Sequence, residues 1–100
     1  KKYKINKIFV PGAFEIPVII SQKIKSYDGF IALGCIIKGK TPHFDFIAHA
    51  INYGIMKISI EQKKPIGNGI LTCLNMHQVN KRLRKGKEAA EAVNKVLLNE

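Results

Sequence analysis

The spacing of apolar and polar positions changes several times along the chain, and each change marks an expected element. Lys4 to Val10 alternates in a β-prone run that Pro11 and Gly12 end, which predicts a strand and then a turn. Glu15 to Lys25 carries isoleucines at helical spacing, and Pro17 falls in the first turn, where its missing N–H removes no hydrogen bond. The N-terminal part therefore predicts strand, turn and helix.

The middle of the chain predicts a buried strand and a long helix. Gly29 to Ile37 is nearly continuous in apolar residues, which is typical of a strand buried on both faces of a parallel sheet. Thr41 and Pro42 supply an N-cap residue and an N1 proline, so a helix is expected from there to about Gln62. Apolar residues cover much of this helix, which predicts one face on the sheet and another on a second subunit.

The last part predicts one more strand and two helices. Pro65 to Cys73 is the strand candidate, Asn75 can cap a short helix through Arg82, and Gly86 to Leu98 forms the final helix. The order βαβαβαα indicates an α/β fold with a parallel sheet, right-handed crossovers and helices on both faces. Ligands of such sheets bind outside the carboxyl ends of the strands. Three loops qualify, at Pro11 to Glu15, Lys38 to His43 and Leu74 to His77.

Length and composition fit one domain over residues 1–100, with 46% hydrophobic content. There is no run of 18 apolar residues and no secretory leader pattern, so a cytoplasmic protein without a membrane partner is expected. Because the first residue is not Met and the first apolar segment starts almost at once, we expect an N-terminal segment to be missing. Cys35 and Cys73 lie in apolar runs and are expected to be buried free thiols.

The net charge of +10 would ordinarily suggest a nucleic acid or another polyanion. Of the 17 basic residues, however, 15 are Lys, and they are scattered along the chain. We therefore expect no nucleic-acid partner, with a basic polyanion-binding α/β module as the alternative.

Two loop segments carry the candidate chemistry. Thr41, Pro42 and His43 would place backbone N–H groups and the positive end of a helix dipole at the edge of the sheet, a site suited to phosphate. His43 beside it suits proton transfer, and a surface histidine is the alternative. Glu15 is the lone acid in its segment and could accept bonds from substrate hydroxyls, or interact only with the helix dipole.

The C-terminal part offers weaker signals. Lys85 and Glu88 are three apart on the last helix and could form only an exposed ion pair. Arg82 and Arg84 could likewise be solvated side chains, but they stand in a chain that uses Lys almost everywhere else, which suggests a planar contact to phosphate. His49 and His77 lack the partner spacing of a metal site, and no nucleotide-binding loop is present. We expect neither a metal nor a cofactor.

Four segments together resemble the lumazine synthases. They read Val-Pro-Gly-Ala-Phe-Glu-Ile-Pro, Ala-Leu-Gly-Cys-Ile-Ile-Lys-Gly-Lys-Thr-Pro-His-Phe-Asp-Phe, Gly-Ile-Leu-Thr and Lys-Gly-Lys-Glu-Ala-Ala. The resemblance covers nearly the whole chain, and Gly39 to Asp45 is its most specific part. It implies a flavodoxin-like three-layer α/β/α sandwich. It also implies a cofactor-free condensation of 5-amino-6-(D-ribitylamino)uracil with 3,4-dihydroxy-2-butanone 4-phosphate, which yields 6,7-dimethyl-8-ribityllumazine, phosphate and water.

The same resemblance implies roles for individual residues. His43 would transfer protons, Lys40 and Thr41 would line the phosphate, Arg82 would pair with it, and Glu15 would face the ribityl chain. The rest of the implied substrate site consists of Ala13, Phe14, Ile36, Ile37, Lys38 and Asn68 around the pyrimidine, with Lys85 and Glu88 as the family's pair on the last helix.

Some features depart from the family. Asn68 stands where many members have Phe, Lys40 replaces a usually small or acidic residue, and the connection from Arg82 to Lys85 is several residues shorter. The family's first, central strand is absent. An inactive family member that keeps only the assembly is therefore a further alternative.

The resemblance also implies an assembly and a partner. Lumazine synthases form pentamers, in some members packed into icosahedral shells, and riboflavin synthase uses their product. Each active site would be shared by two subunits. One would supply Glu15, Lys40, Thr41 and His43, and its neighbour Asn68, Arg82 and Lys85.

Overall fold

A computed structural model describes residues 3–39, 43–75, 77–78 and 84–99, and it has an α/β fold with a parallel sheet. Its elements are a 3-10 turn at Ala13–Glu15, α1 (Ile16–Lys23), β1 (Phe30–Ile37), α2 (His43–Gln62), β2 (Ile66–Cys73) and α4 (Lys85–Leu98). The two strands pair in parallel, from Phe30 opposite Ile66 to Ile37 opposite Cys73. The predicted parallel α/β arrangement is confirmed.

Most predicted element bounds hold within a few residues. Pro17 lies in the first turn of α1, as its missing N–H requires. The expected cap at Asn75 is present, because the Gln78 N–H donates to the Asn75 side-chain oxygen at 3.1 Å. The expected N-cap pair, Thr41 and Pro42, lies outside the described residues, as does most of the expected helix from 75 to 82.

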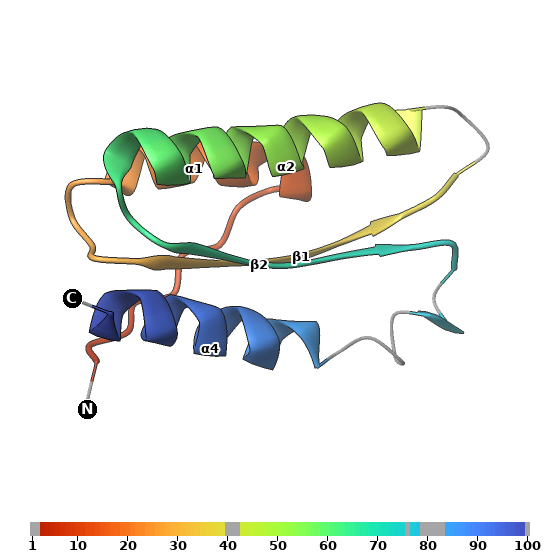
Figure 1. The fold of residues 1–100 in the computed structure, drawn as a ribbon. Helices are drawn as coiled ribbons and strands as arrows, with labels where there is room; N and C mark the ends of the chain where they lie inside the picture. The colour runs from red at the N-terminus through yellow and green to blue at the C-terminus, as the bar shows by residue number, and fades with distance from the viewer. Residues whose placement is uncertain (1–2, 40–42, 76, 79–83, 100) are drawn as a thin grey trace.

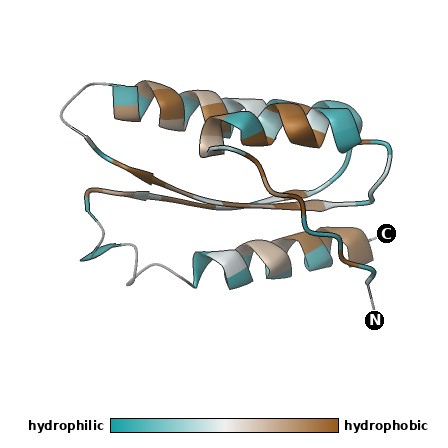
Figure 2. Cartoon of the chain, turned by 180° about the vertical axis from the view of Figure 1, so that it is seen from behind, coloured by the Kyte–Doolittle hydropathy of each residue, from teal (hydrophilic) through white to brown (hydrophobic). Residues whose placement is uncertain are grey.

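The helices cover both faces of the two-stranded sheet: α1 and α2 lie on one face and α4 on the other (Figure 1). Coloured by hydropathy, the strands are largely hydrophobic, whereas the helices alternate between hydrophobic and hydrophilic stretches (Figure 2). This distribution is that of amphipathic helices packed on a sheet.

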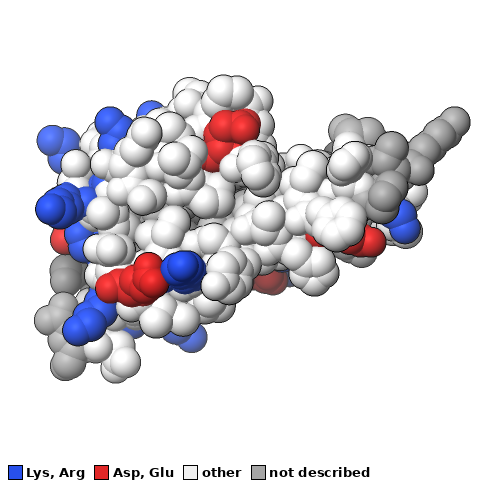
Figure 3. Space-filling view, turned by 90° about the horizontal axis from the view of Figure 1, so that it is seen from above, with Lys and Arg blue, Asp and Glu red and all other residues white. Residues whose placement is uncertain are grey.

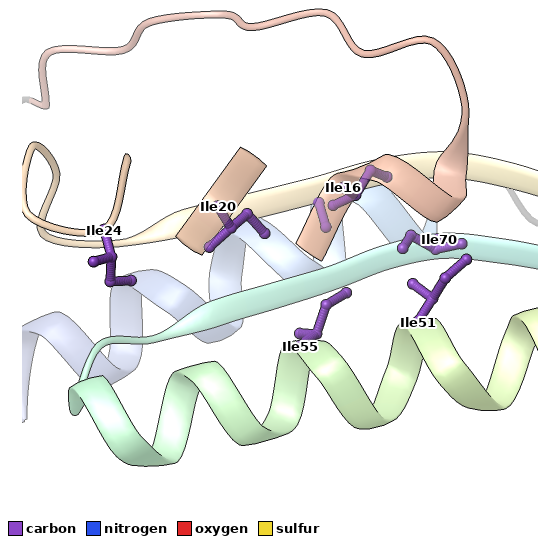
Figure 4. Packing of buried hydrophobic residues seen from close by; sticks show 7 residues of the cluster. Ile16, Ile20, Ile24, Ile51, Ile55 and Ile70 are labelled. Atoms are coloured by element: carbon purple, nitrogen blue, oxygen red, sulfur yellow. The ribbon is translucent and has the colours of Figure 1, made fainter. Parts of the chain in front are cut away.

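The core between α1, α2 and the sheet is built mainly of isoleucine. Its buried members are Ile16, Ile20, Ile24, Ala32, Ile51, Ile55 and Ile70. Figure 4 shows the labelled isoleucines of α1, α2 and β2 gathered in the space between these elements. Fully burying one such side chain contributes roughly 1.5–3 kcal/mol, so this cluster fixes both helices against the sheet.

The strand predicted for residues 4–10 is wrong. The structure has extended chain there without strand pairing, and Ile5 and Phe9 are 77% and 92% exposed. A strand exists only through main-chain bonds to a neighbour, and among the described residues β1 pairs only with β2. Side-chain bonds hold the segment instead: the Tyr3 hydroxyl donates to Asn94 Oδ1 at 2.6 Å, and Asn6 Nδ2 donates to the Tyr27 hydroxyl at 3.1 Å.

The prediction that residues 29–37 are buried on both faces is also wrong. Alternate positions of β1 are exposed, and Leu33 reaches 62%. The cause is that α4 packs mainly on β2, so it leaves one side of β1 uncovered. Cys35 lies on this uncovered side and is exposed, contrary to expectation, whereas Cys73 is buried, and both are free thiols as expected.

Candidate active site

The carboxyl ends of the two strands lie side by side, next to the start of α2 (Figure 1). β1 ends at Ile37, and the Lys38 N–H donates to the Cys73 carbonyl at 2.8 Å, which joins the loops that leave both strands. His43 is the first residue of α2 and is exposed. The edge where open α/β sheets bind ligands therefore carries Lys38 and His43, as predicted.

The turn that carries Glu15 packs against the middle of β1. A Cβ added at Gly34 would lie 3.4 Å from Ile16 Cδ1 and 3.7 Å from Ala13 Cβ, so a small residue at this point of β1 gives the turn room. The turn itself is closed by the Glu15 N–H, which donates to the Gly12 carbonyl at 3.1 Å. A Cβ at Gly12 would lie 3.1 Å from Glu15 Oε1, so this glycine leaves space for the carboxylate.

A surface hollow of about 340 Å³ opens beside this turn. Its lining residues are Phe14, Glu15, Pro17, Val18, Ala50 and Ile51. Phe14 is 60% exposed at its rim, and among the described residues the Glu15 carboxylate is the one charged group in the lining. An apolar hollow with one acid can hold the apolar part of a ligand and accept a hydrogen bond from its polar part.

Sequence reasoning missed four of these six lining residues. Pro17 and Val18 fall in the first turns of α1, and Ala50 and Ile51 lie near the middle of α2. Their spacing indicates only helix faces. Nothing local to either segment signals that the two helices approach each other there.

The remaining predicted residues lie elsewhere. Asn68 is opposite Ala32, five residues before Cys73, which places it roughly 16 Å along the strand from the loop edge. Lys85 and Glu88 are exposed in the first turn of α4, on the face of the sheet opposite to α1 and α2 (Figure 1). Lys40, Thr41 and Arg82 lie outside the described residues.

One chain thus brings together part of the predicted site. The group that surrounds the turn and the loop edge comprises Ala13, Phe14, Glu15, Ile36, Ile37, Lys38 and His43. Asn68, Lys85 and Glu88 do not join this group within the chain.

Charge is distributed unevenly over the face formed by α1 and α2. Basic side chains gather at one end, and most of the rest of this face is uncharged (Figure 3). The sequence places Lys23 and Lys25 at the end of α1 and Lys63 and Lys64 just after α2. These positions are at the amino ends of the strands, away from the loop edge.

The described residues contain neither a metal-binding cluster nor a membrane-spanning helix. No group of three or more His, Cys, Asp and Glu side chains there could hold a metal ion. Likewise, none of the helices in residues 3–39, 43–75, 77–78 and 84–99 has the length and apolar character needed to cross a membrane.

The parallel sheet with helices on both faces places the chain in the class of open α/β proteins, whose ligands usually bind at the carboxyl ends of the strands. Comparison with known proteins identifies a family within this class. The sequence model of the family described as 6,7-dimethyl-8-ribityllumazine synthase matches residues 1–99. The chain belongs to the 6,7-dimethyl-8-ribityllumazine synthase family, as the sequence resemblance implied.

Individual relatives have the same name as this family. The 6,7-dimethyl-8-ribityllumazine synthase of Corynebacterium kroppenstedtii is 48% identical over 75 residues, 75% of this chain and 46% of the relative. The enzyme of that name from Buchnera aphidicola subsp. Baizongia pistaciae is 49% identical over 90 residues, 83% of this chain and 57% of the relative. That of Desulfovibrio desulfuricans is 38% identical over 96 residues, 89% of this chain and 62% of the relative. The chain therefore spans about half the length of the curated relatives it matches.

Proposed function

We propose that this chain contributes to a lumazine synthase active site in riboflavin biosynthesis. The reaction condenses 5-amino-6-(D-ribitylamino)uracil with 3,4-dihydroxy-2-butanone 4-phosphate to 6,7-dimethyl-8-ribityllumazine and releases phosphate and water. The observation that carries the proposal is the position of His43, exposed at the start of α2 beside the carboxyl ends of both strands. Family membership supports the identity of the substrates.

The chemistry needs positioning and proton transfer rather than a covalent enzyme intermediate. Imine formation, phosphate elimination and ring closure each move protons, and the imidazole of His43 can both accept and donate a proton. Lys40, Thr41 and Arg82 would hold the phosphate, and the start of α2 adds N–H groups suited to an anion. Holding two substrates in register can lower the barrier by several kcal/mol.

The hollow beside Glu15 would receive part of the pyrimidine substrate. Its carboxylate is an acceptor for ribityl hydroxyls, and Phe14 supplies an apolar surface at the rim. Ala13 and the backbone of Ile36, Ile37 and Lys38 would complete the pyrimidine side of the site, while Lys85 and Glu88 would act from α4.

The complete fold in this proposal is a flavodoxin-like three-layer sandwich, with a further strand beside β1. The free edge of β1 and the segment 4–10 support it, since β1 pairs only with β2 among the described residues and the segment alternates apolar and polar residues without strand pairing. The protein would assemble as pentamers in the cytoplasm, alone or in an icosahedral shell, and its product would pass to riboflavin synthase. No cofactor, metal, nucleic acid or membrane is needed in this scheme.

The direct test mixes the two substrates with the protein and follows the absorbance of the lumazine. We expect the product to form, and His43→Ala to lower kcat by about 10²-fold or somewhat less, with little change in KM. Unchanged kcat with a raised KM would remove His43 from proton transfer. Absence of product from a correctly assembled protein would favour the inactive family member, and retention of DNA with a steep salt dependence would favour the polyanion-binding module.

A further inference from the structure

Two asparagines from different elements form a polar bridge on the side of the sheet that α2 covers. Asn68 Nδ2, from β2, donates to Asn52 Oδ1, from α2, at 2.8 Å. Asn68 Oδ1 also accepts the backbone N–H of Ile70 at 3.0 Å. Both ends of the Asn68 carboxamide are therefore engaged, although Asn52 is exposed and Asn68 is only half-buried.

These two bonds fix which way the Asn68 amide points. A carboxamide can be turned by 180° with little change in shape, so its orientation follows from its partners. The Ile70 N–H requires an oxygen, which directs Nδ2 toward Asn52. Since Nδ2 carries two hydrogens and Asn52 takes one, the second is available to a ligand as a donor of fixed direction.

The bridge lies at the outer edge of β2. In the parallel ladder, residues such as Pro65 and Cys73 direct their carbonyls toward β1, so the intervening positions direct their main-chain groups outward. Ile70 is one of these positions, and its outward N–H donates a hydrogen bond to Asn68 Oδ1. The Asn68 amide is thereby held at an edge that another molecule or subunit can approach.

We propose that Asn52 is a positioning residue for Asn68, and that Asn68, so held, donates a hydrogen bond to a carbonyl oxygen of the pyrimidine substrate. The inference rests on the proposed function, in which Asn68 would reach the pyrimidine from the neighbouring subunit, as the family resemblance implies. A neutral, planar ring with carbonyl oxygens is a fitting acceptor for an amide N–H. A fixed amide loses less conformational entropy on binding than a free one, so the Asn52 bond strengthens the contact without touching the ring.

The test measures the affinity of the intact protein for the fluorescent lumazine product, which carries the same pyrimidine carbonyls, and separately for inorganic phosphate. Asn52→Ala should weaken lumazine binding by about three- to tenfold, the range expected when one hydrogen bond is lost, and leave phosphate binding unchanged. Asn52→Asp keeps an acceptor for Asn68 Nδ2 and should restore most of the affinity. Gln62→Ala, which removes an exposed amide from the end of the same helix, is the matched control and should change neither affinity.

A second comparison separates positioning from direct contact. In an Asn68→Ala background, Asn52→Ala should have no further effect, because its partner is gone. Failure of Asn52→Asp to restore affinity would mean that the ligand needs the Asn52 N–H itself. An equal loss for lumazine and phosphate, with a lowered Tm, would mean a purely structural bridge.

Failure of Asn52→Asp to restore lumazine affinity would overturn the proposed positioning role, and so would an equal loss of affinity for lumazine and phosphate with a lowered Tm. Normal product formation with unchanged lumazine affinity in Asn52→Ala would overturn this inference and leave the proposed function standing. No product formation by the unmodified protein would instead count against the proposed function.

Discussion

At the scale of single residues, Cys35 combines exposure with a weakened acidity. Partial desolvation by its surroundings raises the pKa of its thiol, and the nearby Cys73 adds a smaller effect in the same direction. Because the thiolate is the reactive form, a raised pKa lowers the reactivity of Cys35 near neutral pH. Exposure alone would suggest the opposite.

We predict that iodoacetamide at pH 8 modifies Cys35 more slowly than it modifies an unstructured peptide cysteine, while Cys73, 1% exposed, reacts only after unfolding. The pH at which the alkylation rate of Cys35 reaches half its maximum should lie above that of the peptide cysteine, which is about 8.5. Mass spectrometry of the alkylated peptides at several pH values measures both rates. A Cys35 rate equal to that of the peptide at every pH would contradict the raised pKa.

Residue-level prediction from sequence succeeded where the signal is local. His43 lies at the predicted helix start that follows the predicted strand 29–37, and the structure has it as the first residue of α2, whereas the strand predicted before Glu15 does not form. Asn52 gave no such signal, because on a helix it is one polar position among several. Its role depends on Asn68, 16 residues further along the chain, and on a contact that exists only after α2 has packed on β2.

At the scale of elements, α4 rests directly on the backbone of β2. A Cβ added at Gly67 would lie 2.9 Å from both the Ala89 carbonyl carbon and Val93 Cγ2. The Ala89 carbon belongs to helix backbone, which cannot move aside as a flexible side chain can. Gly67 therefore sets the distance between helix and strand.

We predict that Gly67→Ala destabilises the protein by about 3 kcal/mol through overpacking. Gly39→Ala is the matched control, since a Cβ there meets nothing within 4 Å, and its effect should stay within about 0.5 kcal/mol. Urea unfolding followed by circular dichroism measures both variants. Equal midpoints would show that α4 can shift away from β2 at little cost.

Most elements could be predicted because their periodicity is local. The two errors have one cause: a sequence pattern records which positions are apolar, but not what lies against them. Residues 4–10 have the alternation of a strand but no neighbouring strand among the described residues, and β1 has an apolar outer side that α4 does not cover.

At the scale of the whole molecule, the residues of the candidate site lie on both faces of the sheet. His43 and Glu15 lie on the side of α1 and α2, whereas Lys85 and Glu88 lie on α4 across the sheet (Figure 1). A site completed by the neighbouring subunit in a closed ring would bring the two groups together through a heterologous interface.

Mixed refolding tests the shared site. Inactive His43→Ala and Arg82→Ala subunits, unfolded, mixed equally and refolded, should pair an intact His43 with an intact Arg82 at about one interface in four. Activity should recover to about that fraction of the unmodified protein, with hybrid rings verified by native mass spectrometry. Hybrids without recovered activity would place both residues in one subunit.

The parallel pairing of β1 with β2 also constrains the order of folding. Phe30 meets Ile66 only after the chain has crossed the sheet through all of α2, so the ladder gains no main-chain bond from a local turn. The loop-closure entropy is smaller if α2 has already formed and collapsed onto β1 through its isoleucines. α2 should therefore be structured in the folding transition state, and the docking of α4 should follow, since its site on β2 exists only once the ladder has formed.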